Sequence, residues 1–169
     1  NGTYQPIMNE KSVQEDLTRA FENTPEFFTP INMLYIGCQI NDIYITAFVD
    51  TGAQVSIMNL DTARRCNLLE RIDTKNRGTV VGVGSQQSVG YVYHVDMMLG
   101  QYIIPCNFMI LRTGPDIIIG LNIMKTHRIS IDMGEGAIKI GGQKIQFLGS
   151  KDIIRSESFD LMKKSNEKK

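Results

Sequence analysis

The stretch Ile43–Gly52, which reads IYITAFVDTG, decides the fold and supplies the first candidate functional residue. Its apolar, β-favouring run leads directly into an aspartate, and such runs are typical of buried strands. The glycine that follows lets the backbone approach closely, and the threonine hydroxyl can brace a loop by bonding to nearby backbone groups. The pattern therefore predicts a strand that delivers the Asp50 carboxylate into a loop held by Thr51 and Gly52.

A second motif lies further along the chain, at Asp116–Gly120. Its Ile118-Ile119-Gly120 core precedes a helical segment, and we expect it to pack beside the Asp50 loop. A carboxylate in a glycine turn with such a neighbour is the arrangement of an aspartic protease. Asp116 itself lacks the Thr-Gly or Ser-Gly sequel, so we interpret it as a turn or cap residue rather than a second catalytic carboxylate.

The chain contains a single Asp-Thr-Gly triplet, and this constrains the mechanism. Peptide hydrolysis by this chemistry needs two carboxylates, one ionised to activate water and one protonated to polarise the scissile carbonyl. Two like charges about 3 Å apart do not both ionise, so the pair titrates as a unit. We therefore predict an obligate homodimer in which Asp50 from each subunit meets at the two-fold axis.

A glycine-rich segment, residues 78–90, supplies a second candidate feature. It does not fit a phosphate-binding loop, because Gln87 stands where the third glycine is needed and no helix follows. We interpret it as a hairpin flap with its tip at 84–87, which would close over a bound peptide and exclude water. An ordinary glycine-rich hairpin is the alternative. The candidate substrate-binding residues are Ala53, Gly82, Val83, Gly84 and Ile119.

Composition narrows the class of protein. With 18 basic and 18 acidic side chains among 169 residues, the formal net charge is zero, so bulk charge predicts neither a nucleic-acid nor an anionic-membrane partner. No apolar run approaches membrane-spanning length, and no signal segment opens the chain. The three cysteines and two histidines form no metal-ligand pattern, so we expect no metal ion and no other cofactor. Unpaired thiols favour a cytoplasmic location.

Three segments are predicted along the chain. Residues 1–32 form a leader with a short helix, interpreted as the end of an upstream helical region, in which Val13, Leu17 and Phe21 share one face. Residues 33–149 form the protease domain, and 150–169 a charged tail or linker. Many short strands with glycine turns predict a mainly β fold, a closed barrel with short helices. The predicted strands are Met33–Ile40, Ile43–Val49, Val55–Met58, Gly78–Val83, Ser88–Val95, Met97–Leu99, Tyr102–Ile110, Ile117–Ile119, Ile129–Met133, Ala137–Ile140 and Lys144–Leu148; the predicted helices are Leu60–Cys66 and Leu121–His127.

With these residues in view, the region from Met33 to Leu148 resembles the retroviral-like aspartic protease domain of the DNA-damage-inducible protein 1 family, which are ubiquitin-dependent shuttle proteases. The resemblance implies a homodimeric endopeptidase with the closed barrel of retroviral-type acid proteases. The stretches that carry it are Met33–Ile36, Ala47–Gln54, Ala63–Cys66, Ile72–Thr74, Gly82–Gly84, Pro105-Cys106, Ile119–Leu121 and Ile131-Asp132.

The chain departs from viral enzymes at one ion pair. Those enzymes typically have aspartate after the alanine that follows the triplet, and it pairs with the arginine of a Gly-Arg-Asn motif. Here the two positions hold Gln54 and Leu121, so both partners are absent together. The shuttle family shares this departure, and its members often have aspartate where Asn122 stands.

The resemblance also implies partners. Members act on heavily ubiquitinated proteins and reach ubiquitin or the proteasome through domains that this chain does not contain. For this chain we expect a cytoplasmic location and also a nuclear one. Two alternatives remain open from the residues. One is a retrotransposon-derived protease that cuts its own polyprotein. The other is a non-catalytic dimerisation or ubiquitin-chain-binding scaffold that keeps the protease fold.

Overall fold

The computed structural model describes residues 10–25, 34–76, 79–80, 86–149 and 152, and the chain divides into two compact units, 1–32 and 33–169. The first unit contains helix α1, Glu10–Asn23, which confirms the predicted short helix. Leu17 and Phe21 lie one turn apart on this helix and are exposed. None of the helices in the described ranges is long and apolar enough to cross a membrane.

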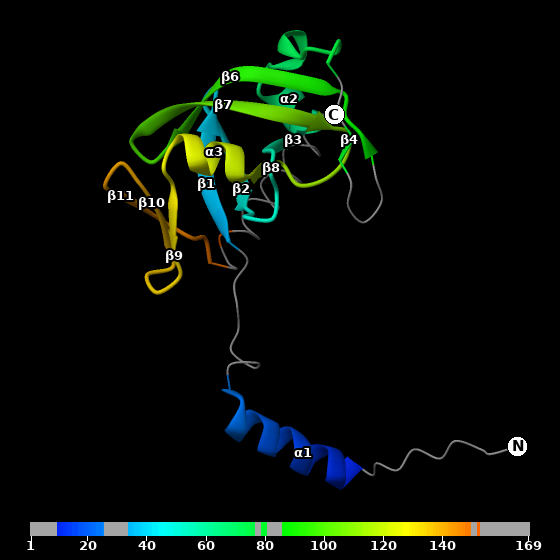
Figure 1. Ribbon diagram of the computed structural model, residues 1–169, viewed down its shortest axis with the longest axis vertical. Helices are drawn as coiled ribbons and strands as arrows, with labels where there is room; N and C mark the ends of the chain where they lie inside the picture. The colour runs from blue at the N-terminus through cyan, green and yellow to red at the C-terminus, as the bar shows by residue number, and fades with distance from the viewer. Residues whose placement is uncertain (1–9, 26–33, 77–78, 81–85, 150–151, 153–169) are drawn as a thin grey trace, which may run out of the picture. The chain divides into compact units, whose positions relative to one another are not determined.

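Six strands of the second unit close into a barrel, as predicted, and their order around it is β1-β2-β8-β3-β7-β6 (Figure 1). Parallel pairs join β2 to β8 and β3 to β7, and the remaining neighbours are antiparallel. The strands are β1 Tyr35–Ile40, β2 Ile43–Val49, β3 Ile57–Asn59, β6 Gly90–Leu99, β7 Tyr102–Leu111 and β8 Ile117–Ile119.

Local sequence accounts for the first hairpin. Asn41 and Asp42 adopt φ values of 48° and 62°, and the side chains of Asn and Asp tolerate this left-handed region better than those of most residues. The turn sets the register between β1 and β2, so that alternate residues of β2, namely Ile45, Ala47 and Val49, face the core. Both strands of this hairpin were predicted from the sequence.

The β6–β7 hairpin differs from prediction. Residues 88–95 and 97–99 were predicted as separate strands, but Gly90–Leu99 is one strand. Asp96, which lies between the two predicted strands, is exposed and alternates with the buried Val95 and Met97, and pairing with β7 continues through it. The irregularity lies earlier, at a bulge between Val92 and Val95 in which His94 takes a φ of 52°.

The predicted flap is described only at its base. A two-stranded ladder pairs β4, Thr79–Val80, with β5, Gln86–Gln87. Gln86 and Gln87, predicted to lie in the tip, therefore belong to an arm, because they pair with Val80 and Thr79. The remaining tip lies outside the described residues.

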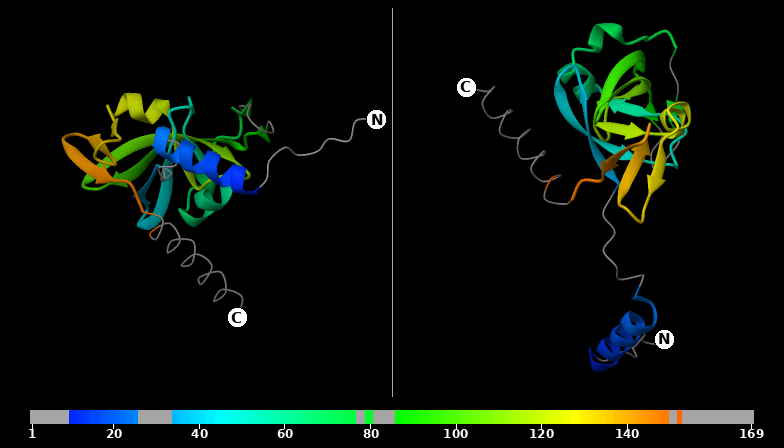
Figure 2. Two further views of the ribbon diagram at one scale, coloured as in Figure 1. Left: turned by 90° about the horizontal axis from the view of Figure 1, so that it is seen from below. Right: turned by 90° about the vertical axis from the view of Figure 1, so that its left-hand side faces the viewer.

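Three further strands form a separate sheet, β9 Ser130–Asp132, β10 Ala137–Ile140 and β11 Gln143–Gln146. They are drawn in yellow to orange next to the barrel (Figures 1 and 2). Ile138 and Ile140 belong to the same buried core as the barrel strands, which fixes this sheet to the barrel. On its surface, Lys139 bridges Asp132 and Glu135 at N–O distances of 3.0 and 3.3 Å.

Two short α-helices and a 3₁₀ turn complete the unit: α2 Leu60–Arg65, η2 Leu69–Arg71 and α3 Leu121–Thr126. Asn59 caps α2 by accepting a 2.7 Å hydrogen bond from the Thr62 amide, and Asn67, just after the helix, takes a φ of 57°. The 3₁₀ turn was not predicted, because its Leu-Glu-Arg sequence carries no turn or cap residue.

Candidate active site

Asp50 lies immediately after β2, at the barrel position that the sequence predicted. β2 runs between β1 and β8, so backbone hydrogen bonds on both sides fix the strand that carries Asp50. The Asp50 amide donates to the Ile119 carbonyl at 3.0 Å, which continues the β2–β8 pairing one residue beyond the strand. Its half-buried side chain therefore starts from a rigid element rather than from a free loop.

The turn after β2 orients the carboxylate. The Gly52 amide donates to Asp50 Oδ1 at 2.8 Å, and the Ala53 amide donates to the Asp50 carbonyl at 3.3 Å. A Cβ on Gly52 would lie 3.1 Å from Asp50 Oδ1, which is tighter than ordinary contact. Thr51 is exposed, and its hydroxyl makes no hydrogen bond within the described part of the chain. Its loop-bracing role stays a prediction.

The Ile118-Ile119-Gly120 motif packs beside this loop, as predicted. The Leu121 amide donates to the Ala53 carbonyl at 2.8 Å, and the Asn122 amide donates to the Gln54 carbonyl at 3.2 Å. The approach is close enough that a Cβ on Gly120 would lie 2.7 Å from the Ala53 oxygen. Residues 50–56 and 119–122 thus form one hydrogen-bonded unit.

Ser56, a buried serine that the sequence did not single out, and Asn122 join the two segments. Ser56 Oγ donates to Asn122 Oδ1 at 2.6 Å and accepts from the Gly120 amide at 2.8 Å. The Ser56 amide donates to the same Asn122 oxygen at 2.8 Å. No local pattern marks these residues as partners, because they lie 66 positions apart in the sequence.

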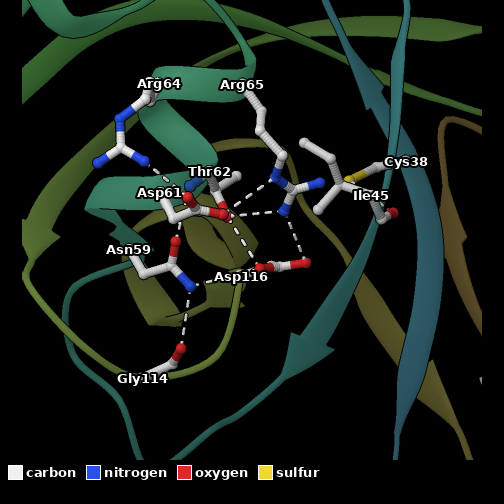
Figure 3. Close-up of polar contacts among 9 residues, drawn as sticks. All are labelled: Cys38, Ile45, Asn59, Asp61, Thr62, Arg64, Arg65, Gly114 and Asp116. Atoms are coloured by element: carbon white, nitrogen blue, oxygen red, sulfur yellow. Dashed lines mark hydrogen bonds and ion pairs between the residues drawn. The ribbon is translucent and has the colours of Figure 1, made fainter. Parts of the chain in front are cut away.

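Asp116 holds the start of β8 in place (Figure 3). Its Oδ1 accepts from Thr62 Oγ1 at 3.0 Å and from Asn59 Nδ2 at 3.3 Å, while Oδ2 lies 3.1 Å from Arg65 Nη2. All of these partners belong to the end of β3 or to α2. The carboxylate joins secondary-structure elements through their side chains, and the residue that caps α2 is Asn59 rather than Asp116.

The candidate substrate-binding residues differ in accessibility. Ala53 is half-buried beside Asp50, but Ile119 is only 1% exposed and belongs to the main core. Gly82, Val83 and Gly84 lie outside the described residues. The neighbour Ile118 points to the other side of the sheet, where it packs on a second apolar cluster formed by Ile57, Met109, Leu111 and Tyr91.

The three cysteines, which are the other potential nucleophiles considered, are buried. Burial raises the pKa of the thiols of all three cysteines, that of Cys66 to about 11 and that of Cys106 to about 12. Such thiols stay protonated and unreactive at neutral pH. The His127 ring contacts the Pro105 carbonyl at 2.9 Å. Within the described ranges, no cluster of three or more His, Cys, Asp or Glu could hold a metal ion.

Comparison with known proteins places these features in context. A model of the aspartyl protease family matches residues 25–132. The chain is 35% identical over 158 residues to DNA damage-inducible protein 1 of Candida glabrata, which covers 94% of this chain and 37% of the relative. It is 37% identical over 144 residues to Protein DDI1 homolog 2 of Homo sapiens, covering 83% of this chain and 36% of the relative.

A solved structure shares the fold as well. The retroviral protease-like domain of Ddi1 from Leishmania major superimposes with a TM-score of 0.65 at 36% identity, covering 70% of this chain and 98% of that domain. These matches confirm the resemblance found from the sequence motifs. The chain spans between a third and two fifths of the length of the curated relatives that it matches.

Proposed function

Because this chain belongs to the aspartyl protease family, we propose that it is an aspartic endopeptidase, active as a homodimer, with Asp50 of each subunit activating a water molecule. One observation carries the proposal. The Asp50 carboxylate stands at the end of a buried barrel strand, and the Gly52 amide holds its Oδ1 at 2.8 Å. This turn presents a carboxylate at a defined position beside the Gly120 segment.

The proposed chemistry needs a second carboxylate from another copy of the chain. One Asp50, ionised, takes a proton from water as the water attacks the scissile carbonyl. The Asp50 of the second copy, protonated, donates its proton to the carbonyl oxygen as charge develops there. A two-fold axis beside the turn brings identical carboxylates together, since a two-fold interface uses the same surface on both subunits.

The surface around the turn supports association. Thr51 and Gly52 are exposed on this surface. Apolar side chains are exposed on both hydrogen-bonded segments, 50–56 and 119–122: Val55 is 37% exposed and Leu121 is 44% exposed. Covering such side chains favours association by about 25 cal/mol per Å² of apolar area.

Substrate binding is proposed to follow the strand-addition mode. An extended peptide would pair its main chain with Gly52 and with the flap at Gly82, Val83 and Gly84, and its alternate side chains would enter apolar pockets. Ala53 is retained as a pocket residue. Because Ile119 faces the core, Ile118 and the cluster around Ile57 are better placed to receive a side chain on that side.

From the family resemblance we further propose polyubiquitinated proteins as substrates, recruited through ubiquitin- or proteasome-binding domains outside this chain, in the cytoplasm or nucleus. The test is cleavage of an unstructured polyubiquitinated substrate across roughly pH 4–7, where coupled carboxylates titrate. Asp50→Asn should abolish cleavage. Asp42→Asn, at the other end of β2, should not, because Asn also tolerates the left-handed turn position.

Subunit mixing tests the shared site directly. If each site needs Asp50 from both chains, adding an equal amount of Asp50→Asn protein should lower the activity per wild-type subunit to about half, since half of the partners are then inactive. Activity that does not change on mixing would contradict a shared site. A folded dimer that cleaves nothing would instead support the scaffold alternative.

A further inference from the structure

The Asp50 loop is anchored at both ends on the same neighbouring segment. At its start, the Asp50 amide binds the Ile119 carbonyl. At its end, Ser56 binds the Gly120 amide and the Asn122 side chain through its hydroxyl, and its own amide binds the same asparagine oxygen. The carboxylate therefore has a position relative to residues 119–122 that two separate sets of hydrogen bonds determine.

The Ser56–Asn122 contact has properties that suit a positioning role. Ser56 is fully buried, and in a low-dielectric surrounding each hydrogen bond is stronger and each missing partner more costly. Asn122 Oδ1 accepts two of these bonds, so a single atom fixes both the backbone and the side chain of Ser56. The bond from Ser56 Oγ, at 2.6 Å, lies at the short end of the normal range.

We infer that Ser56 and Asn122 are positioning residues for the Asp50 carboxylate, an inference that rests on the proposed function. Two carboxylates that share a proton must be held about 3 Å apart. A misplacement of about 1 Å can lower a rate about 100-fold. Neither residue contacts the reacting atoms, and both act through the loop backbone. Ser56 and Asn122 link residues 50–56 to residues 119–122, and the ion pair of viral enzymes, at the positions of Gln54 and Leu121, would link the same two segments.

Alanine and conservative variants separate positioning from general stability. Ser56→Ala and Asn122→Ala should each lower kcat roughly 10- to 100-fold and leave KM within about twofold, because substrate contacts are unchanged. Asn122→Asp keeps an oxygen that accepts both bonds, and Ser56→Thr keeps the hydroxyl, so each should retain kcat within about threefold of wild type. The double alanine variant should lose no more activity than the less active of the two single variants, because both substitutions break the same hydrogen-bond network.

A matched control and a second measurement complete the test. Ile140→Val removes a methylene from the core in β10, far along the chain from the Asp50 loop, and should leave kcat unchanged. Hydrogen exchange should become faster at residues 50–56 in Asn122→Ala and stay unchanged at 137–140. The inference is overturned if wild type cleaves and Asn122→Ala cleaves equally well, or if exchange at 50–56 does not change. If wild type itself does not cleave, the proposed function fails first, and the positioning role fails with it.

Discussion

Gly120→Ala should destabilise the protein and displace the Asp50 loop, because the packing leaves no room for a methyl group. A Cβ at this position would lie 2.7 Å from the Ala53 carbonyl oxygen and 2.9 Å from the Val55 carbonyl oxygen. Both are backbone atoms, so no side-chain rotation relieves the contact. The φ of −97° is accessible to alanine, and the cost is therefore steric rather than conformational.

The magnitude follows from three contributions. Forcing a methyl group into a packed site costs about 1–3 kcal/mol. Lengthening the hydrogen bond from the Leu121 amide to the Ala53 carbonyl, now 2.8 Å, costs about 1 kcal/mol more. Alanine recovers about 0.4–1 kcal/mol by reducing the entropy of the unfolded chain. We expect the free energy of unfolding to fall by about 1–3.5 kcal/mol.

Urea unfolding followed by circular dichroism measures this change, since the chain contains no tryptophan for fluorescence. The matched control is Gly134→Ala, where the nearest atom would be the Asp132 carboxylate at 3.4 Å and φ is not positive. That variant should be neutral or up to about 1 kcal/mol more stable. The steric argument would be refuted if Gly120→Ala were as stable as wild type, or if both variants changed equally.

Three other expectations address stability away from the loop. Asp116→Ala should lower the free energy of unfolding by about 2 kcal/mol, because it leaves the buried Thr62 hydroxyl without its acceptor. Asp61→Ala, which removes an exposed ion pair, should lower it by less than about 1 kcal/mol in the same urea titration. Burial raises the pKa of the Cys66 thiol from 9.0 to about 11, so the unfolded state loses this proton at a lower pH than the folded state does. The stability that this thiol contributes should be fully present below about pH 9 and fall by about 1.4 kcal/mol per pH unit up to about pH 11. Cys66→Ala should remove this part of the pH dependence of the free energy of unfolding. Asn67→Ala, at a φ of 57°, should lower the melting temperature, while Asn67→Gly should preserve or raise it; equal effects would contradict a conformational cost.

Features with a short-range cause were predictable from the sequence. The β1–β2 hairpin follows from two residues that tolerate positive φ between alternating apolar runs. The cap at Asn59 and the end of α2 at Asn67 follow from side chains that bond to their own backbone or tolerate a left-handed turn. The place of Asp50 after a buried strand has the same kind of cause.

Features that depend on distant partners were not predictable in detail. Residues 88–95 and 97–99 were predicted as separate strands, but pairing with β7 carries one strand through Asp96. Gln86 and Gln87 have the composition of a loop, yet they pair with Val80 and Thr79. In each case cross-strand hydrogen bonds outweigh a weak local preference.

The sequence by itself determined the strand, the turn and the carboxylate at Asp50, because apolar alternation and glycine act within a few residues. Only the tertiary structure decided what fixes that carboxylate. Ser56 and Asn122 are ordinary polar residues until the barrel closes and buries the serine against the start of α3. Burial then makes an unmade hydrogen bond costly, so the two residues form a specific contact that no local pattern encodes.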